Sequence, residues 1–237
     1  MMVIGAHSAD FVWRAGGAVA VTTAGGGEAA VIALSYGERG ESGDLWRDQD
    51  PAHPQTIENV KKIRHGEAER AAAALGATFE CLDFGDYPLE IDGDGLRLIS
   101  EKIREFAPDV LITHTDTDPF NPDHPIAHHA VDRARGLAAG AGVASAFATI
   151  SPPALFLFEP HQPELCNFTP TTFVDITGVM AAKLAAMAEM KAQKYLQTYY
   201  AERADHRGNH ARRSSGNADI RQAEAFQRVT PQVVSAL

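Results

Sequence analysis

The chain has little cysteine, fewer basic than acidic side chains, and no long apolar run. Its two cysteines, Cys81 and Cys166, are far apart and neither has a C-x-x-C partner, so we expect reduced thiols and no thiolate zinc site. The formal net charge is -10, whereas nucleic-acid-binding proteins normally carry an excess of basic residues, so the charge argues against that class of protein. It does not exclude an anionic substrate, because local charge governs binding.

Membrane-spanning and targeting patterns are also missing. No apolar run approaches the roughly 20 residues that cross a bilayer, and the N-terminus starts in a strand pattern without the charged region of a signal peptide. The glycines at 25–27 lack the G-x-G-x-x-G spacing and follow a predicted helix, so they predict a turn and not a phosphate cradle. We therefore expect a cytoplasmic protein with neither a membrane nor a nucleic-acid partner.

The composition that remains is that of a globular chain, with 45% apolar and 22% charged residues. A length of 237 residues allows one large and well-buried core. The chain has no internal repeat, low-complexity tract or convincing linker. We therefore predict a single domain over residues 1–237.

Apolar runs typical of buried parallel strands alternate with amphipathic runs typical of helices. We expect strands at 2–6, 29–36, 78–84, 109–115, 154–158 and 173–176. We expect helices at 11–20, 55–75, 94–106, 126–139 and 178–201, with a long polar loop over 37–54. This order predicts an α/β fold, a Rossmann-like three-layer α/β/α sandwich with a mostly parallel sheet.

Candidate metal ligands follow two of the predicted strands. His7 and Asp10 come directly after the first strand, and His124 comes after the strand at 109–115. The carboxyl ends of parallel strands share one edge of the sheet, where ligands bind in open α/β folds. Two imidazoles and a carboxylate suit a catalytic zinc with an open position. Alternatively, His7 is a helix cap or a core residue and His124 only begins a helix.

These segments also carry a family resemblance. The chain resembles the PIG-L/LmbE-like family of zinc-dependent N-deacetylases over nearly its whole length. The resembling segments are an A-H-P-D-D-like element at 6–10, a G-E-x-G-E-like element at 37–41, an H-P-D-H-like element at 121–124, and 174–177 leading into the helix with Lys183 and Gln193. The resemblance implies one Zn²⁺ per chain, or another divalent metal, held by His7, Asp10 and His124.

Two positions depart from the family pattern. Ala9 stands where the deacetylases have the aspartate that acts as general base, and a methyl group accepts no proton. Asn121 stands where they have the histidine that assists the transition state or the leaving amine, and an amide is not a proton shuttle. General acid–base groups contribute roughly 10²–10⁴ in rate. The two losses together predict a reaction other than amide hydrolysis.

The altered pattern is similar to one branch of the family, the 4-oxalomesaconate hydratases. The similar strings lie at 6–17, 37–42, 85–88, 123–125 and 158–164. This resemblance implies a metal-dependent hydro-lyase that adds water to 4-oxalomesaconate (4-carboxy-2-hydroxymuconate) in gallate and protocatechuate breakdown. The product would be 4-carboxy-4-hydroxy-2-oxoadipate. Two alternatives are a zinc-dependent N-deacetylase of an amino sugar or related amide with a relocated base, and a non-catalytic binding protein.

Hydration needs a base for water and a group that handles the second proton. Glu41 and Glu38 lie in the loop after the second strand, and we favour Glu41 because it is farther from the strand and freer to reach inward. Alternatively, one or both pair with Arg39 or Arg47. His161 is a candidate acid or substrate contact, or else a structural loop residue, and Asn121 joins the candidate catalytic set as an amide donor.

A tricarboxylate substrate also needs cations, and arginine suits carboxylates best. Arg14 lies one turn past Asp10, and Arg39 lies beside the proposed base. The segment 203–213 is a basic island that offers Arg212 and Arg213 as further substrate ligands. It is either a solvated helix end and loop or an anion-collecting lid, contributed in place or to a neighbouring subunit. We expect a small polycarboxylate substrate and a homo-oligomer.

Overall fold

The fold is built on one seven-stranded sheet in the order β3-β2-β1-β4-β5-β7-β6. The computed structural model describes residues 1–47, 49 and 52–236. The strands are β1 Met2–Gly5, β2 Ala30–Ala33, β3 Thr78–Cys81, β4 Val110–Thr113, β5 Ala154–Phe158, β6 Thr172–Asp175 and β7 Ala223–Arg228. The five from β3 to β5 in this order are parallel, whereas β7 pairs antiparallel with both β5 and β6. The predicted mostly parallel α/β sheet is confirmed.

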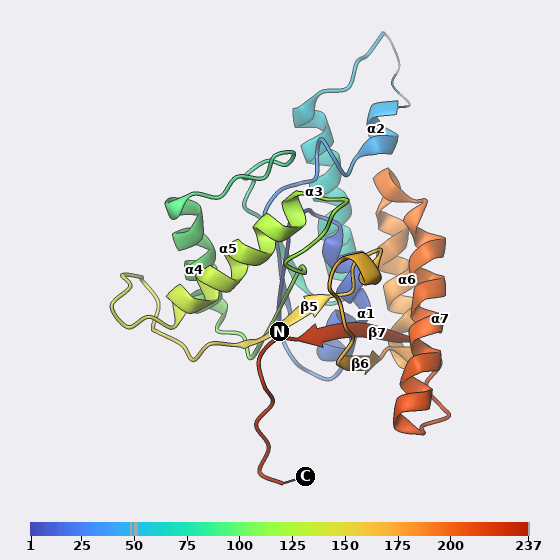
Figure 1. Cartoon of the computed structure of the whole chain (residues 1–237). Coiled ribbons are helices and arrows are strands. Elements are labelled where there is room, and N and C mark those ends of the chain that lie inside the picture. The colour runs from blue at the N-terminus through green and yellow to red at the C-terminus, as the bar shows by residue number, and fades with distance from the viewer. Residues whose placement is uncertain (48, 50–51, 237) are drawn as a thin grey trace.

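Helices cover both faces of this sheet (Figure 1). They are α1 Asp10–Ala24, α2 Gly43–Arg47, α3 Ile57–Ala74, α4 Gly93–Phe106, α5 Asp123–Ala138, α6 Met180–Glu189 and α7 Leu196–Ser215. In β1, Val3 packs into a core with α1, α3, α6 and α7, while Met2 and Ile4 pack into a second core with α4 and α5. Because successive side chains of a strand point to opposite faces, continuous apolar runs bury both faces. The three-layer sandwich is therefore as predicted.

The C-terminal third differs from the prediction. A single helix over 178–201 is wrong, because the chain breaks between α6 and α7 with a 3-10 turn at Lys191–Gln193. Glu67 accepts the Ala192 N–H at 3.0 Å, and this tertiary contact replaces a helical hydrogen bond. Helix α7 then continues through the basic island to Ser215 and ends at Gly216, whose φ of 73° suits glycine. The basic island is therefore the end of a helix, as one of the two interpretations held in part.

Two further elements were not predicted. Strand β7 carries charged and polar residues and has no apolar run, yet it lies between β5 and β6. Helix α2 lies inside the loop predicted over 37–54, of which positions 48, 50 and 51 fall outside the described residues. The glycines at 25–27 form the predicted turn between α1 and β2. In the described part of the chain, no helix is long and apolar enough to cross a membrane.

The site-bearing loops leave the carboxyl ends of β1 and β4. These strands are neighbours, and the chain continues from β1 to β2 on its other side, so the strand order reverses there. Such a reversal opens a crevice between the two loops. Gly5 closes the turn after β1, because a Cβ on it would lie 2.9 Å from Asp10 Cβ. The turn therefore directs the residues after β1 toward those after β4.

Candidate active site

The three predicted metal ligands meet at this edge of the sheet. His7 and Asp10 come from the turn after β1, and His124 lies in the first turn of α5. His7 Nδ1 lies 3.6 Å from Asp10 Oδ2, and His124 Nε2 lies 3.7 Å from Asp10 Oδ1. All three side chains are buried. His124 thus lies at the start of a helix, as expected if it were only a helix-starting residue, but its side chain also faces His7 and Asp10.

The donor atoms of this trio fit a divalent cation. His7 Nδ1 and His124 Nε2 are buried and have no hydrogen-bond partner among the described residues. Leaving such atoms unpaired costs free energy, and a metal ion would take up both lone pairs. Two imidazole nitrogens and one carboxylate are also the ligand types of catalytic zinc sites. These residues could therefore hold a metal.

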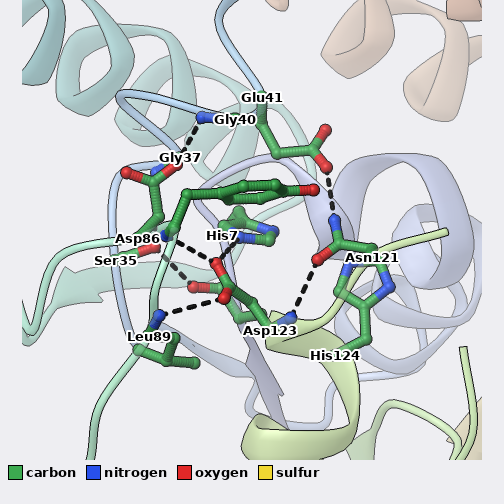
Figure 2. Close-up of polar contacts among 12 residues, drawn as sticks. His7, Ser35, Gly37, Gly40, Glu41, Asp86, Leu89, Asn121, Asp123 and His124 are labelled. Atoms are coloured by element: carbon green, nitrogen blue, oxygen red, sulfur yellow. Dashed lines mark hydrogen bonds and ion pairs between the residues drawn. The ribbon is translucent and has the colours of Figure 1, made fainter. Parts of the chain in front are cut away.

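Carboxylates orient the two imidazoles from behind. His7 Nε2 lies 3.1 Å from Asp123 Oδ2 (Figure 2), and His124 Nδ1 lies 2.7 Å from Asp118 Oδ2. Contacts of this kind fix which nitrogen of a histidine faces a metal. Burial lowers the pKa of His7, but the bond to Asp123 and the nearby carboxylates outweigh it and raise that pKa to about 9. A metal would therefore displace a proton from His7 at neutral pH.

Asp10 is held as a charged ligand by its neighbours. Burial opposes its ionisation, yet His114 and Arg14 together hold the pKa of Asp10 well below its usual range. His114 Nε2 lies 3.0 Å from Asp10 Oδ2, and Arg14 Nη1 donates to Asp10 Oδ1 at 3.2 Å. Burial, followed by the charges of His114 and Arg14, lowers the pKa of His124. His124 is therefore neutral, with a lone pair available to a metal.

A cavity of about 600 Å³ opens beside the trio. It is lined by charged and polar side chains together with aromatic ones: Arg14, Glu41, Tyr87, Asp118, Phe120, Asn121, His124, His161, Gln162, Tyr195 and Tyr199. The volume suits a small-molecule ligand. Four predicted residues besides His124, namely Arg14, Glu41, Asn121 and His161, lie on this wall.

Glu41 is fixed at the cavity by two amides. Asn121 Nδ2 donates to Glu41 Oε1 at 2.6 Å, and Gln193 Nε2 donates to Glu41 Oε2 at 2.5 Å. Asn121 is itself oriented, because its Oδ1 accepts the Asp123 N–H at 3.1 Å (Figure 2). The Asn121 amide thus supports a carboxylate at the cavity wall. Sequence reasoning reached Gln193 only through the resemblance.

Glu38 and Arg39 take other positions. Glu38 is fully buried, lies 3.1 Å from Arg39 Nη1 and 3.8 Å from Lys61 Nζ, and does not line the cavity. Burial raises the pKa of Glu38. Arg39 Nη1 also lies 3.5 Å from Asp86, and Arg39 stays outside the cavity wall. The structure thus matches the alternative in which Glu38 pairs with Arg39.

The arginines of α7 also lie away from the cavity. Arg212 donates to the Ile220 carbonyl at 2.8 Å, Arg213 is exposed, and neither lines the cavity. Arg203 and Arg207 pair with the buried carboxylate of Glu159. Internal ion pairs therefore account for part of the basic island. Of the predicted substrate ligands, only Arg14 reaches the cavity.

A second cluster supports the trio from the side. Asp86 accepts the Gly40 N–H at 2.7 Å, and Asp123 accepts the Leu89 N–H at 2.9 Å (Figure 2). Asp123 also accepts the Tyr87 N–H at 3.0 Å. Possible metal-ligating atoms of His7, Asp86 and Asp123 also lie within 4.8 Å of one another. The carboxylates of Asp86 and Asp123, however, already accept hydrogen bonds from these backbone N–H groups. The hydrogen bond to Asp123 holds the Tyr87 backbone at a φ of 44°, and the Tyr87 ring lies against Gly40.

Sequence reasoning missed most of these supporting residues. His114 and Asp118 lie in the loop after β4, and Asp123 is the middle of the H-P-D-H-like element. Tyr87 lies in the segment 85–88, which resembles the hydratases, but its position predicted no role for its side chain. The available signal was their position at strand ends, where polar residues face the sheet edge. Tyr200 of α7, whose hydroxyl accepts a hydrogen bond from Arg14 Nε at 3.2 Å, lies far along the chain from these strand ends and carried no such signal.

Similarities to known proteins identify the family of this chain. The family model PIG-L, described as GlcNAc-PI de-N-acetylase, matches residues 2–135. A 4-oxalmesaconate hydratase of Pseudomonas putida KT2440 is 42% identical over the whole chain and 91% of its own length. The crystal structure of GalB, the 4-carboxy-2-hydroxymuconate hydratase of that organism, superposes with a TM-score of 0.95 at 43% identity, covering 100% of this chain and 98% of that one.

A more distant structure shares the fold alone. The N,N'-diacetylchitobiose deacetylase of Pyrococcus horikoshii superposes with a TM-score of 0.76 at 19% identity, over 96% of this chain and 82% of its own. The expected family resemblance is confirmed by the family model and by the full-length relative. The chain therefore belongs to the PIG-L family, within a group that includes hydratases as well as deacetylases.

Proposed function

We propose that this chain is a metal-dependent hydratase that adds water to 4-oxalomesaconate (4-carboxy-2-hydroxymuconate) to give 4-carboxy-4-hydroxy-2-oxoadipate. One observation carries the proposal: the two acid–base positions of the deacetylases hold Ala9 and Asn121, and the Asn121 amide instead holds Glu41 at the cavity wall. The full-length similarity to a 4-oxalmesaconate hydratase supports the same reaction.

We assign Zn²⁺, or another divalent metal, to His7, Asp10 and His124. When bound there, such an ion would polarise a substrate oxygen and stabilise the negative charge that develops on hydration. The protein prepares the site by leaving two buried nitrogens unpaired and by keeping Asp10 ionised. Asp123 and Asp118 hold the imidazoles in place.

Glu41 is the proposed base. The two amides each donate one hydrogen bond to its carboxylate, and each oxygen retains a free lone pair. Glu41 would take a proton from water as the water oxygen bonds to one carbon of the C=C bond and the C=C electrons move onto the conjugated oxo oxygen. The protonated Glu41 would then return its proton to the other carbon of the former double bond, which completes the addition of water and restores the carboxylate. Ala9 contributes no proton acceptor at its position.

Arg14 is the proposed carboxylate ligand of the substrate. It is the one lysine or arginine side chain among the described residues that line the cavity. Its Nη1 and Nε atoms are engaged with Asp10 and Tyr200, so the guanidinium is fixed and presents its remaining N–H groups. The fit of a small polycarboxylate rests on this charge together with the metal and the hydroxyl and amide groups of the wall.

The test is a paired assay on the zinc-loaded protein. Incubation with 4-carboxy-2-hydroxymuconate should remove the conjugated ultraviolet absorbance and yield a product heavier by one water. A parallel incubation with N-acetyl sugars should release no acetate. Acetate release without loss of absorbance would replace the hydratase by the alternative N-deacetylase.

We also propose that residues 1–237 act as one catalytic domain in a cytoplasmic homo-oligomer. The sheet joins strands from both ends of the chain, which favours one folding unit. Light scattering on the purified protein measures the oligomeric state directly. A mass equal to the 25.4 kDa chain would contradict the oligomer.

A further inference from the structure

We propose that Tyr200 is a positioning residue that fixes His161 as a neutral imidazole carrying its proton on Nε2, so that His161 serves as a hydrogen-bond donor to the substrate and not as a base. This inference deepens the proposed hydratase function and depends on it for the identity of the substrate. The tautomer of His161 itself does not depend on it.

The proton positions follow from a chain of three side chains. Arg14 Nε lies 3.2 Å from the Tyr200 hydroxyl, which lies 3.2 Å from His161 Nδ1. A guanidinium only donates, so the Tyr200 oxygen accepts from Arg14. The single hydroxyl hydrogen of Tyr200 then has His161 Nδ1 as its acceptor. No other acceptor for it occurs in the described part of the chain. His161 Nδ1 is therefore unprotonated, and a neutral ring carries its hydrogen on Nε2.

Tyr200 is held rigidly in this role. Its ring is buried and stacks on Trp13 with centroids 5.7 Å apart and an interplanar angle of 19°. Lys183 Nζ lies 5.9 Å from the ring centroid on the buried side of α7. Burial raises the pKa of Tyr200 to about 12, so the hydroxyl keeps its hydrogen at neutral pH. Arg14 is anchored on Asp10 and can only donate, so it sets the direction of the hydrogen bonds from Arg14 through Tyr200 to His161.

The loop that carries His161 is anchored as well. The His161 carbonyl accepts hydrogen bonds from the Tyr199 hydroxyl at 2.6 Å and from Arg203 Nη2 at 3.0 Å. The charged and titratable groups around the ring are Arg14 and Asp10 of α1 and Tyr199, Tyr200 and Arg203 of α7. Burial, followed by the charge of Arg14, lowers the pKa of His161 to about 3.

The protonated edge of His161 is the one available to a ligand. His161 lines the cavity, its Nδ1 is taken by Tyr200, and its Nε2 has no partner among the described residues. A fixed N–H of this kind stabilises an oxygen that gains negative charge during the reaction. The two residues therefore have different roles. Glu41 takes the proton from water, whereas His161 donates a hydrogen bond to an oxo or carboxylate oxygen of the substrate without exchanging a proton.

The tautomer is tested by ¹⁵N NMR of the zinc-loaded protein labelled at histidine, without substrate. The expected His161 signals are a protonated Nε2 and an unprotonated Nδ1, unchanged from pH 5.5 to pH 8.5. Tyr200→Phe should give a mixture of tautomers, whereas the matched variant Tyr199→Phe should keep the wild-type tautomer. A protonated Nδ1 in the wild type, or an unaltered tautomer in Tyr200→Phe, would overturn the proposal.

Kinetics test the role of His161 as a donor. His161→Gln keeps an N–H near the Nε2 position and cannot act as a base, whereas His161→Asn places its amide near the Nδ1 position. We expect kcat to fall by about tenfold or less in His161→Gln and by about 10² or more in His161→Asn. Equal losses of about 10²–10⁴ in both variants would identify His161 as a base and overturn the proposal. If the wild type has no hydratase activity, the proposed function fails while the NMR result still decides the tautomer.

Discussion

At the scale of single residues, the site separates two glutamates that lie three positions apart. Glu41 faces the cavity between two amides, while Glu38 is buried beside Arg39 and Lys61. Glu41→Gln keeps the size and removes the basicity, so kcat should fall by about 10²–10⁴ with metal content unchanged. Glu38→Gln is the matched control, expected to lower the melting temperature and keep kcat near wild type. Steady-state kinetics with metal analysis measure both, and normal kcat in Glu41→Gln would remove Glu41 from the mechanism.

The arginines differ in the same way. Arg14 reaches the cavity, whereas Arg212 is engaged with the Ile220 carbonyl at the end of α7. Arg14→Ala should raise KM by about tenfold or more, and more than it lowers kcat, because it removes a binding contact remote from the reacting carbon. Metal content must be checked, since Arg14 also holds Asp10. Arg212→Ala should leave both KM and kcat unchanged. A rise in KM as large as that of Arg14→Ala would show that the end of α7 contributes to substrate binding.

At the scale of elements, the loop at 37–42 and the segment at 85–88 are packed without spare room. A Cβ on Gly40 would lie 2.1 Å from the Tyr87 ring. Gly40→Ala should therefore displace Tyr87 or the loop and lower kcat/KM by about ten- to a hundredfold. Gly136→Ala in α5 is the control, because nothing lies within 4 Å of its Cβ position and alanine in a helix stabilises by about 0.5–1 kcal/mol. Kinetics and thermal melts of both variants test this, and wild-type kinetics in Gly40→Ala would show that the contact is dispensable.

At the scale of the whole molecule, metal binding joins two distant parts of the chain. His7 and Asp10 precede and begin α1, while His124 lies in α5 on the other face of the sheet. A ligand that binds only the folded chain stabilises it by about 2.7 kcal/mol at a hundredfold excess over Kd. Zinc should therefore raise the melting temperature by about 5–10 °C. A chelator should reverse the shift and abolish activity, and His7→Ala should show no shift. An equal shift in His7→Ala would place the metal elsewhere.

The sequence by itself determined the parallel sheet and the meeting of His7, Asp10 and His124. Both follow from local pattern, because apolar runs mark buried strands and the carboxyl ends of parallel strands lie at one edge of the sheet. The departures at Ala9 and Asn121 were also visible in the sequence, since they fall inside recognisable elements.

Only the tertiary structure decided which loop side chains face the cavity. Glu41 and Glu38 look alike in sequence, and the choice between them depends on Asn121, Gln193 and Asp86, all distant along the chain. The break between α6 and α7 likewise depends on Glu67, and the proton on His161 depends on Tyr200. Periodicity reports the burial of an element, but the orientation of a polar side chain follows from the partners that folding brings to it.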